Sequence, residues 1–68
     1  MKLISGKEFC SFLEKKGWRL ERIKGSHHIY GKQDEKIKLS IPVHKNKTLK
    51  KGLLAYFLKI ANLSEKDL

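Results

Sequence analysis

The sequence lacks the features on which disulfide-rich, membrane-spanning and cofactor-binding proteins depend. Its one cysteine, Cys10, excludes an intramolecular disulfide framework and a cysteine-only zinc site within the chain. No apolar run approaches the roughly 20 residues that span a bilayer, and the two apolar residues between Lys2 and Ser5 are too few for a signal peptide. No phosphate-binding loop or dinucleotide fingerprint is present. We therefore expect a reduced, cytoplasmic protein with no cofactor and no membrane segment.

The chain is also short, which limits what it can build. With 68 residues it has room for one domain, which we assign to residues 1–68, and for one small core. A chain of this length buries only about 60% of the surface that its unfolded form exposes. A deep cleft around a large ligand is therefore not expected, and binding of a partner could add to the stability of the fold.

Acidic residues are scarce relative to basic ones. The chain has 16 Lys and Arg against 7 Asp and Glu, for a net charge of +9, and residues 44–52 carry four lysines and no acid (Lys45, Lys47, Lys50 and Lys51). Such an excess favours polyanions, because each phosphate that a protein neutralises releases condensed counterions. The alternative is a solvated lysine-rich surface. A membrane surface fits less well, because the basic run has no matching stripe of Trp or Phe.

Two segments have the pattern of amphipathic helices. In the first, Ser5 and Glu8 fit a capping box, residues 9, 12 and 13 form an apolar face, and Gly17 is placed to end the helix, so we predict a helix over 6–16. The second is predicted to begin near Thr48 as N-cap, with Asn62 as its C-terminal cap. Its expected apolar stripe consists of Leu49, Leu53, Tyr56, Phe57 and Ile60, widened by Leu54, Leu58 and Ala61. We predict a frayed tail or a single turn over 64–68.

Three short strands are predicted between the helices, over 18–23, 27–32 and 36–41, separated by turn signals. In the third, Ile37, Leu39 and Ile41 alternate with polar residues and are expected to face the core. Pro42 cannot donate to a ladder, so pairing should stop there or lie at an edge. The fold class is therefore α+β, with the order α-β-β-β-α: a three-stranded antiparallel sheet with both helices on one face. This is the order of double-stranded RNA-binding domains.

The three histidines are the candidates for chemistry, because an ordinary histidine titrates at about pH 6.5 and can carry a proton near neutrality. If Ile29 faces the helices, His27 lies at the rim of the core, and His28 points to the open face of the sheet. For each histidine, an ordinary surface role is the alternative. A metal site would need His27 or His28 together with His44 and Cys10. Cys10 is more simply a small buried hydrophobe, so we expect no metal.

Five short elements, in this order along the chain, carry a resemblance to a known family. They are Gly17-Trp18, Lys-Gly-Ser-His-His-Ile-Tyr at 24–30, Ile-Pro-Val-His at 41–44, Lys51-Gly52, and Ile-Ala-Asn-Leu at 60–63. Together they resemble the HicA-type toxins of the HicAB toxin–antitoxin systems, over nearly the whole chain. The chain departs from the family pattern at residues 32–34, where many members have a His-Pro pair, and at Lys50, where many have proline.

The resemblance implies a fold like that of double-stranded RNA-binding domains and the activity of a ribosome-independent mRNA endonuclease. It also implies inhibition by a HicB-type antitoxin and a bacterial or archaeal cytoplasm. The family's catalytic histidine lies in the Gly-Ser-His element, which corresponds to His27 here. His28 follows it directly and is the second, less favoured candidate.

A metal-free ribonuclease can use the 2′-hydroxyl of RNA as its nucleophile, and these residues fit that chemistry. We expect His27 to act as general acid or base. Lysines and the amides at the start of the second helix would hold the phosphates and stabilise the charge that grows on them. The candidate lysines are Lys24, Lys45, Lys47, Lys50 and Lys51. Ser26 either orients the scissile phosphate or caps the turn. His44 is a second proton carrier or phosphate donor, or makes a structural hydrogen bond.

Two other functions stay open from the sequence alone. One is an RNA-binding module without chemistry, in which the lysines contact the phosphate backbone and the histidines only donate hydrogen bonds. The other is an inactive family member that retains partner binding. The antitoxin of a chain with a charge of +9 is expected to be acidic. We expect it to cover His27 and the basic start of the second helix, and we expect the free protein to be a monomer.

Overall fold

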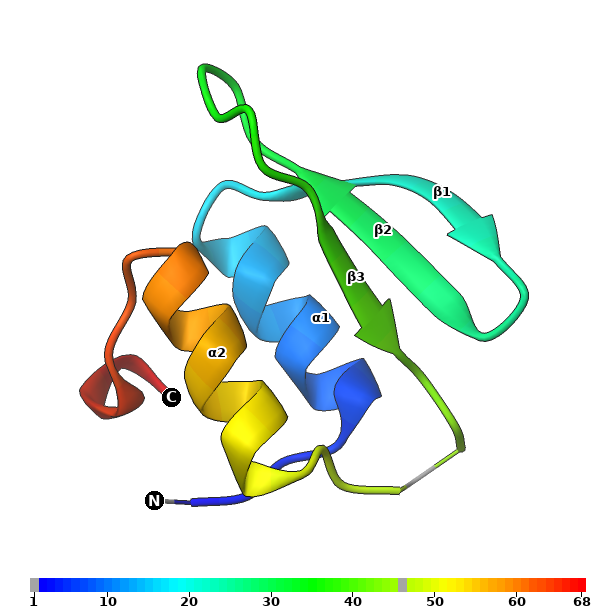
Figure 1. The fold of residues 1–68 in the computed structure, drawn as a ribbon, viewed down its shortest axis with the longest axis vertical. Helices are drawn as coiled ribbons and strands as arrows, with labels where there is room; N and C mark the ends of the chain where they lie inside the picture. The colour runs from blue at the N-terminus through cyan, green and yellow to red at the C-terminus, as the bar shows by residue number, and fades with distance from the viewer. Residues whose placement is uncertain (1, 46) are drawn as a thin grey trace.

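The computed structural model describes residues 2–45 and 47–68. Its elements are α1 (Gly6–Lys15), β1 (Arg19–Lys24), β2 (His27–Gly31), β3 (Leu39–Pro42), α2 (Lys51–Ile60) and the short 3-10 helix η1 (Glu65–Asp67). The strands form one antiparallel sheet in the order β1-β2-β3. The helices α1 and α2 lie side by side against this sheet (Figure 1). The predicted α+β class and the order α-β-β-β-α are confirmed.

The first helix begins as its local sequence predicts. The Oγ of Ser5 accepts a hydrogen bond from the Glu8 amide at 3.1 Å, and the Ser5 amide donates to Oε1 of Glu8 at 3.0 Å. The hydrogen bond from the Ser5 amide is the main cause that holds the pKa of the Glu8 carboxyl below its usual value. Gly17 has a φ of 95° and follows the helix in the left-handed region. The helix ends at Lys15, one residue before the predicted end.

The core lies between the helices and one face of the sheet. The rings of Phe9 on α1 and Phe57 on α2 stack with centroids 5.7 Å apart, which joins the two helices. Cys10 is buried beside Phe9, and this burial raises the pKa of its thiol. The largest fully buried side chains come from both helices and the sheet: Tyr30, Phe9, Leu13, Leu39, Ile41 and Leu54. Among the described residues, no helix has the length and apolar character needed to cross a membrane.

The third strand is shorter than the alternation predicts. It begins at Leu39, and Ile37 lies outside it with 48% of its surface exposed. The reason is the length of its neighbour. β2 ends at Gly31, and the last pair in the ladder is Tyr30 with Leu39, so Ile37 has no cross-strand partner to hold it against the core. The expectation that Ile37 faces the core was wrong. Pro42 ends β3 at an edge of the sheet, as predicted.

The second helix begins later than predicted, and a different set of its residues is buried. Lys50, not Thr48, is the N-cap, because Thr48 forms an isolated bridge with Ser5, and the next amide, of Leu49, donates to the Ile4 carbonyl at 2.8 Å. These bonds keep the backbone extended up to Lys50. The buried residues of the helix are Leu54, Phe57 and Leu58, followed by Ala61, whereas Leu53 and Tyr56 are exposed.

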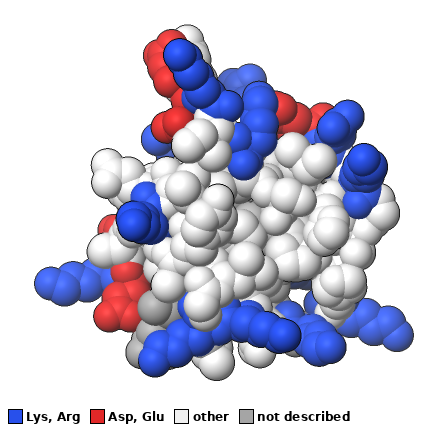
Figure 2. Space-filling model, viewed as in Figure 1, with Lys and Arg blue, Asp and Glu red and all other residues white. Residues whose placement is uncertain are grey.

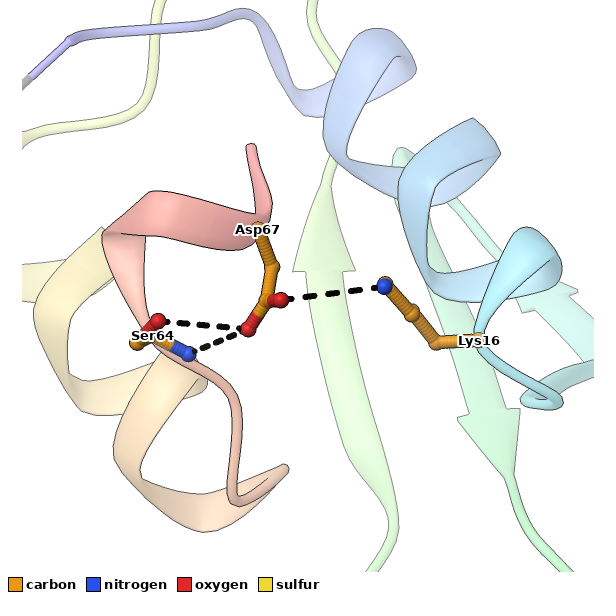
Figure 3. A network of polar contacts seen from close by, with 3 residues as sticks. All are labelled: Lys16, Ser64 and Asp67. Atoms are coloured by element: carbon orange, nitrogen blue, oxygen red, sulfur yellow. Dashed lines mark hydrogen bonds and ion pairs between the residues drawn. The ribbon is translucent and has the colours of Figure 1, made fainter.

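The chain end forms a single turn that docks on α1, one of the two predicted outcomes. Asn62 has a φ of 58° and follows α2 in the left-handed region, but the C-cap is Ala61 and not Asn62 as predicted. Asp67 accepts a hydrogen bond from the Ser64 amide at 2.9 Å and lies 3.8 Å from Nζ of Lys16 (Figure 3). The Ser64 amide, and to a smaller extent Lys16, hold the pKa of Asp67 below its usual value. Leu68 packs partly buried against the core.

Candidate functional site

The pairing of β2 with β3 decides which way the two adjacent histidines point. His28 is opposite Ile41, and Tyr30 is opposite Leu39. Cross-strand partners share a face of the sheet, and Tyr30, Leu39 and Ile41 are buried under the helices. His28 therefore faces the helices and is half-buried, whereas the exposed His27 points to the other face, which we call the open face.

The alternative arrangement, in which Ile29 faces the helices and His28 the open face, is not the one found. Tyr30 takes the core position instead, where its hydroxyl donates to Oε2 of Glu14 on α1 at 2.6 Å. Burial and the hydrogen bond to Glu14 raise the pKa of the Tyr30 hydroxyl well above its usual value. With Tyr30 in the core, Ile29 and His27 are left on the open face.

His27 is the first residue of β2 and has a partner on each side. Lys24 on β1 and Pro42 on β3 are directly opposite it, at the roughly 4.5–5.5 Å between Cβ atoms that is usual for such pairs. Arg22 is opposite Ile29 and so shares the open face with His27 and Lys24. The imidazole thus lies among cations on an exposed surface. Arg22 was missed in the sequence, although the alternation of Arg22 with Ile23 and Lys24 could have indicated it.

Ser26 ties the turn before His27 to the end of β3. Its carbonyl accepts a hydrogen bond from the Val43 amide at 2.8 Å, which extends the pairing of β2 with β3 beyond Pro42. The turn itself is built by Gly25, which has a φ of 60°. The Ser26 hydroxyl has no hydrogen-bond partner among the described residues, so the structure shows no turn cap from this side chain.

A groove lies between the end of β3 and the start of α2. We call it the basic groove; it has a volume of about 310 Å³ and is lined by Pro42, His44, Lys47, Thr48, Leu49, Lys50 and Leu53. Figure 2 shows basic side chains gathered along the edge of the molecule where the β3–α2 connection and the start of α2 lie in Figure 1. The first turn of α2 has no acidic residue and no side-chain cap, so its first amides are available to an anion.

Pro42 connects the basic groove to His27. It lines the groove and is also the cross-strand partner of His27. Through Pro42, the pair formed by His27 and Lys24 adjoins one end of the groove that His44, Lys47 and Lys50 line. A family model for the HicA toxin of bacterial toxin–antitoxin systems matches residues 6–63, which contain all of these residues. The chain belongs to the HicA toxin family. No curated protein matched the sequence.

Other predicted site residues of this HicA-family protein lie outside the groove. Lys45 and Lys51 are exposed and follow His44 and Lys50 in the chain, but they do not line the groove. His28 is separated from the basic residues because it faces the helices, opposite Ile23 on β1 and Ile41 on β3. Among the described residues, no three His, Cys, Asp or Glu side chains gather as a metal site would require.

The far end of the sheet in this HicA-family fold has a different electrostatic character. Glu21, at a bulge in β1, accepts a hydrogen bond from Nζ of Lys38 at 2.6 Å. The Glu21 carboxylate reaches this position over Gly31, where a Cβ atom would collide with it. The charge of Lys38 is thus compensated by Glu21. At the His27 end, Arg22 and Lys24 have no such partner among the described residues.

Proposed function

We propose that this HicA-family protein is an endoribonuclease that cleaves mRNA without a metal ion, acts in the cytoplasm and is inhibited by a HicB-type antitoxin. The observation that carries the proposal is the position of His27. Its imidazole is exposed, lies directly across from Lys24, and is joined through Pro42 to the basic groove. An RNA strand whose phosphates contact these lysines would pass over the imidazole.

In the proposed reaction, the 2′-oxygen of a ribose attacks the adjacent phosphorus while His27 takes the proton of the 2′-hydroxyl. The bond from phosphorus to the 5′-oxygen breaks, and that oxygen receives a proton from a second donor, for which His44 or water is the candidate. The products are a 2′,3′-cyclic phosphate and a free 5′-hydroxyl. Atoms and protons balance without a cofactor.

Lysines and backbone amides would supply the rest of the catalysis. Charge grows on the phosphate oxygens in the transition state, and fixed positive groups stabilise it more than they stabilise the ground state. Lys24 is the cation next to His27, and Lys47 and Lys50 hold the strand along the basic groove. The amides at the start of α2 can bind a phosphate in the same region. The Ser26 hydroxyl, at the turn before His27, is available to orient the scissile phosphate.

The test compares two adjacent histidines that face opposite sides of the sheet. We expect His27→Gln to lower the rate of RNA cleavage by about 10²- to 10⁴-fold, with little change in RNA affinity, because the lysines remain. His28→Gln is the matched control and should cleave at close to the parental rate. Cleavage is followed with a labelled transcript, and affinity is measured with a 2′-O-methylated RNA that lacks the attacking hydroxyl.

Three results would contradict parts of this proposal. Parental cleavage by His27→Gln removes His27 from the mechanism, and loss of cleavage in His28→Gln alone assigns the role to His28. Parental cleavage that stops when a chelator is added shows that a metal takes part. If the parental protein binds RNA and never cleaves it, the chain is an RNA-binding module. In that case its induction in cells should not arrest growth.

A further inference from the structure

The open face of the sheet carries a small apolar spot next to His27. Ile29 follows His27 by two positions on β2, so both side chains point to this face, about 7 Å apart along the strand. Ile29 is half-buried on the middle strand, with Arg22 on β1 and Ser40 on β3 directly opposite it. An apolar side chain, flanked by a cation and a hydroxyl, thus adjoins the proposed catalytic group.

An ion pair closes the other end of this apolar spot. Gly31 is the next residue of β2 on the open face, and a Cβ atom there would collide with the Glu21 carboxylate and lie 2.9 Å from Nζ of Lys38. These two side chains are joined by a hydrogen bond of 2.6 Å. The spot therefore extends over little more than the Ile29 side chain. It has the size of one planar ring and offers a protein partner too little apolar area for a stable interface.

The polar groups on either side of Ile29 are available to a ligand. Arg22 is exposed and has no acidic partner among the described residues. Ser40 is also exposed, and its hydroxyl makes no hydrogen bond within the part of the chain that the structure describes. A guanidinium plane stacks on nucleic-acid bases, and a hydroxyl can donate to or accept from the edge of a base. With a net charge of +9, the chain attracts the nucleic acid that carries such bases.

We propose that the open face holds one unpaired base of the RNA beside the bond that is cleaved, with its ring between Ile29 and the Arg22 guanidinium and its edge toward Ser40. The inference rests on the proposed function in one respect, namely that His27 acts on the adjacent ribose. It specifies that the substrate is single-stranded at the cleavage site. In a duplex, stacked neighbours cover both faces of each base, and side chains cannot enter the narrow major groove of A-form RNA, so a paired base cannot lie on the sheet.

Arg22→Lys tests the stacking contact, because lysine keeps the positive charge and loses the guanidinium plane. Arg19→Lys is the matched control: Arg19 is also exposed on the open face of β1, but it is opposite Gly31 and not Ile29. Ile29→Thr removes apolar surface and keeps a β-branched residue in the strand. Circular dichroism verifies that the variants are folded. The probes are a labelled 2′-O-methylated single strand and the same strand annealed to its complement, and affinities are measured by fluorescence anisotropy at several salt concentrations.

We expect the parental protein to bind the single strand more tightly than the duplex. Arg22→Lys should weaken single-strand binding by about 5- to 100-fold, because one stacking contact is lost, without changing the salt dependence, because the charge is retained. Ile29→Thr should weaken it by about 4- to 10-fold through the lost apolar contact. Arg19→Lys should stay within about twofold of the parental affinity.

Three results would overturn the inference. Parental affinity of Arg22→Lys for the single strand would show that Arg22 contacts phosphate alone. Equal losses in Arg22→Lys and Arg19→Lys would show that no base lies specifically on Ile29. Parental binding of the duplex that equals or exceeds binding of the single strand would show that the substrate is paired. Because these RNAs cannot be cleaved, failure of the nuclease proposal would be visible separately, as absence of cleavage of an unmodified transcript by the parental protein.

Discussion

The hydrogen bond between Tyr30 and Glu14 has a consequence for the residues beside it. It favours a core position for Tyr30, and strand alternation then sends His28 to the same face and His27 to the open face. The sequence alone predicts that the two histidines diverge, but not which of them is exposed. The arrangement found is stabilised by an acceptor on α1, sixteen residues away along the chain. A long-range polar contact thus supports the arrangement in which His27 is exposed.

Replacement of Tyr30 by Phe measures how much the hydrogen bond to Glu14 contributes to the stability of the fold. We expect Tyr30→Phe to lower the free energy of unfolding by about 1–2 kcal/mol near neutral pH, because a hydrogen bond to a carboxylate is lost. The pKa of Tyr30 is raised in the fold, chiefly by burial. Its stabilising effect is therefore complete below the unfolded pKa of about 10 and is lost as the pH rises above it.

Urea unfolding of the parent and of Tyr30→Phe, from neutral pH to above about pH 10, tests whether the stabilisation by Tyr30 decreases as the pH rises. The stability difference between the two proteins should shrink above about pH 10, since phenylalanine has no proton to lose. Lysines and the other tyrosine titrate in both proteins and cancel in the difference. A difference that stays constant with pH would mean that the Tyr30 hydroxyl titrates in the fold as it does in the unfolded chain.

At the scale of elements, predictions succeeded where the determining contacts are local. The start of α1 is set by Ser5 and Glu8, which are three residues apart, and the capping box was readable in the sequence. The start of α2 was predicted wrongly because Thr48 pairs with Ser5, a contact between distant segments. The start of β3 was also predicted wrongly, because β2 ends before it could pair with Ile37. The same holds for the basic groove. Its lysines were predicted from the sequence, but the position of its apolar lining residues depends on where α2 begins, which local sequence does not determine.

Two glycines near the starts of the helices give a direct test of these packing contacts. A Cβ atom on Gly6 would collide with the carbonyl oxygen of Pro42, whereas nothing lies within 4 Å of a Cβ on Gly52. We expect Gly6→Ala to destabilise the fold by about 1–3 kcal/mol, since backbone must move to accommodate the methyl group. Gly52→Ala should instead stabilise it by up to about 1 kcal/mol. Thermal unfolding checks whether the melting temperature falls in Gly6→Ala and rises in Gly52→Ala. Stabilisation by Gly6→Ala would show that α1 is not held tightly against the end of β3.

The whole molecule combines a net charge of +9 with an uneven placement of that charge. Lys38 is paired with Glu21 at one end of the sheet, and Lys16 is paired with Asp67 beside the chain end. The cations that line the basic groove have no acidic neighbour among its described lining residues. The long-range attraction for a polyanion is therefore directed to the edge that also carries His27, and both proposed partners, RNA and an acidic antitoxin, are drawn to the same place.

This placement predicts how RNA affinity depends on salt. For single strands, each phosphate contact contributes about −0.7 to the slope of log K against log salt concentration. Lys50→Gln should reduce the magnitude of the slope by about that amount, because one contact is lost. Glutamine removes no cap, since the Lys50 side chain makes no capping hydrogen bond.

The matched control is Lys59→Gln, in the last turn of the same helix. It lowers the net charge equally and should leave the slope unchanged. Titrations with a 2′-O-methylated oligonucleotide at several salt concentrations give both slopes, and equal slopes for the two variants would show that RNA responds to the total charge and not to the basic groove.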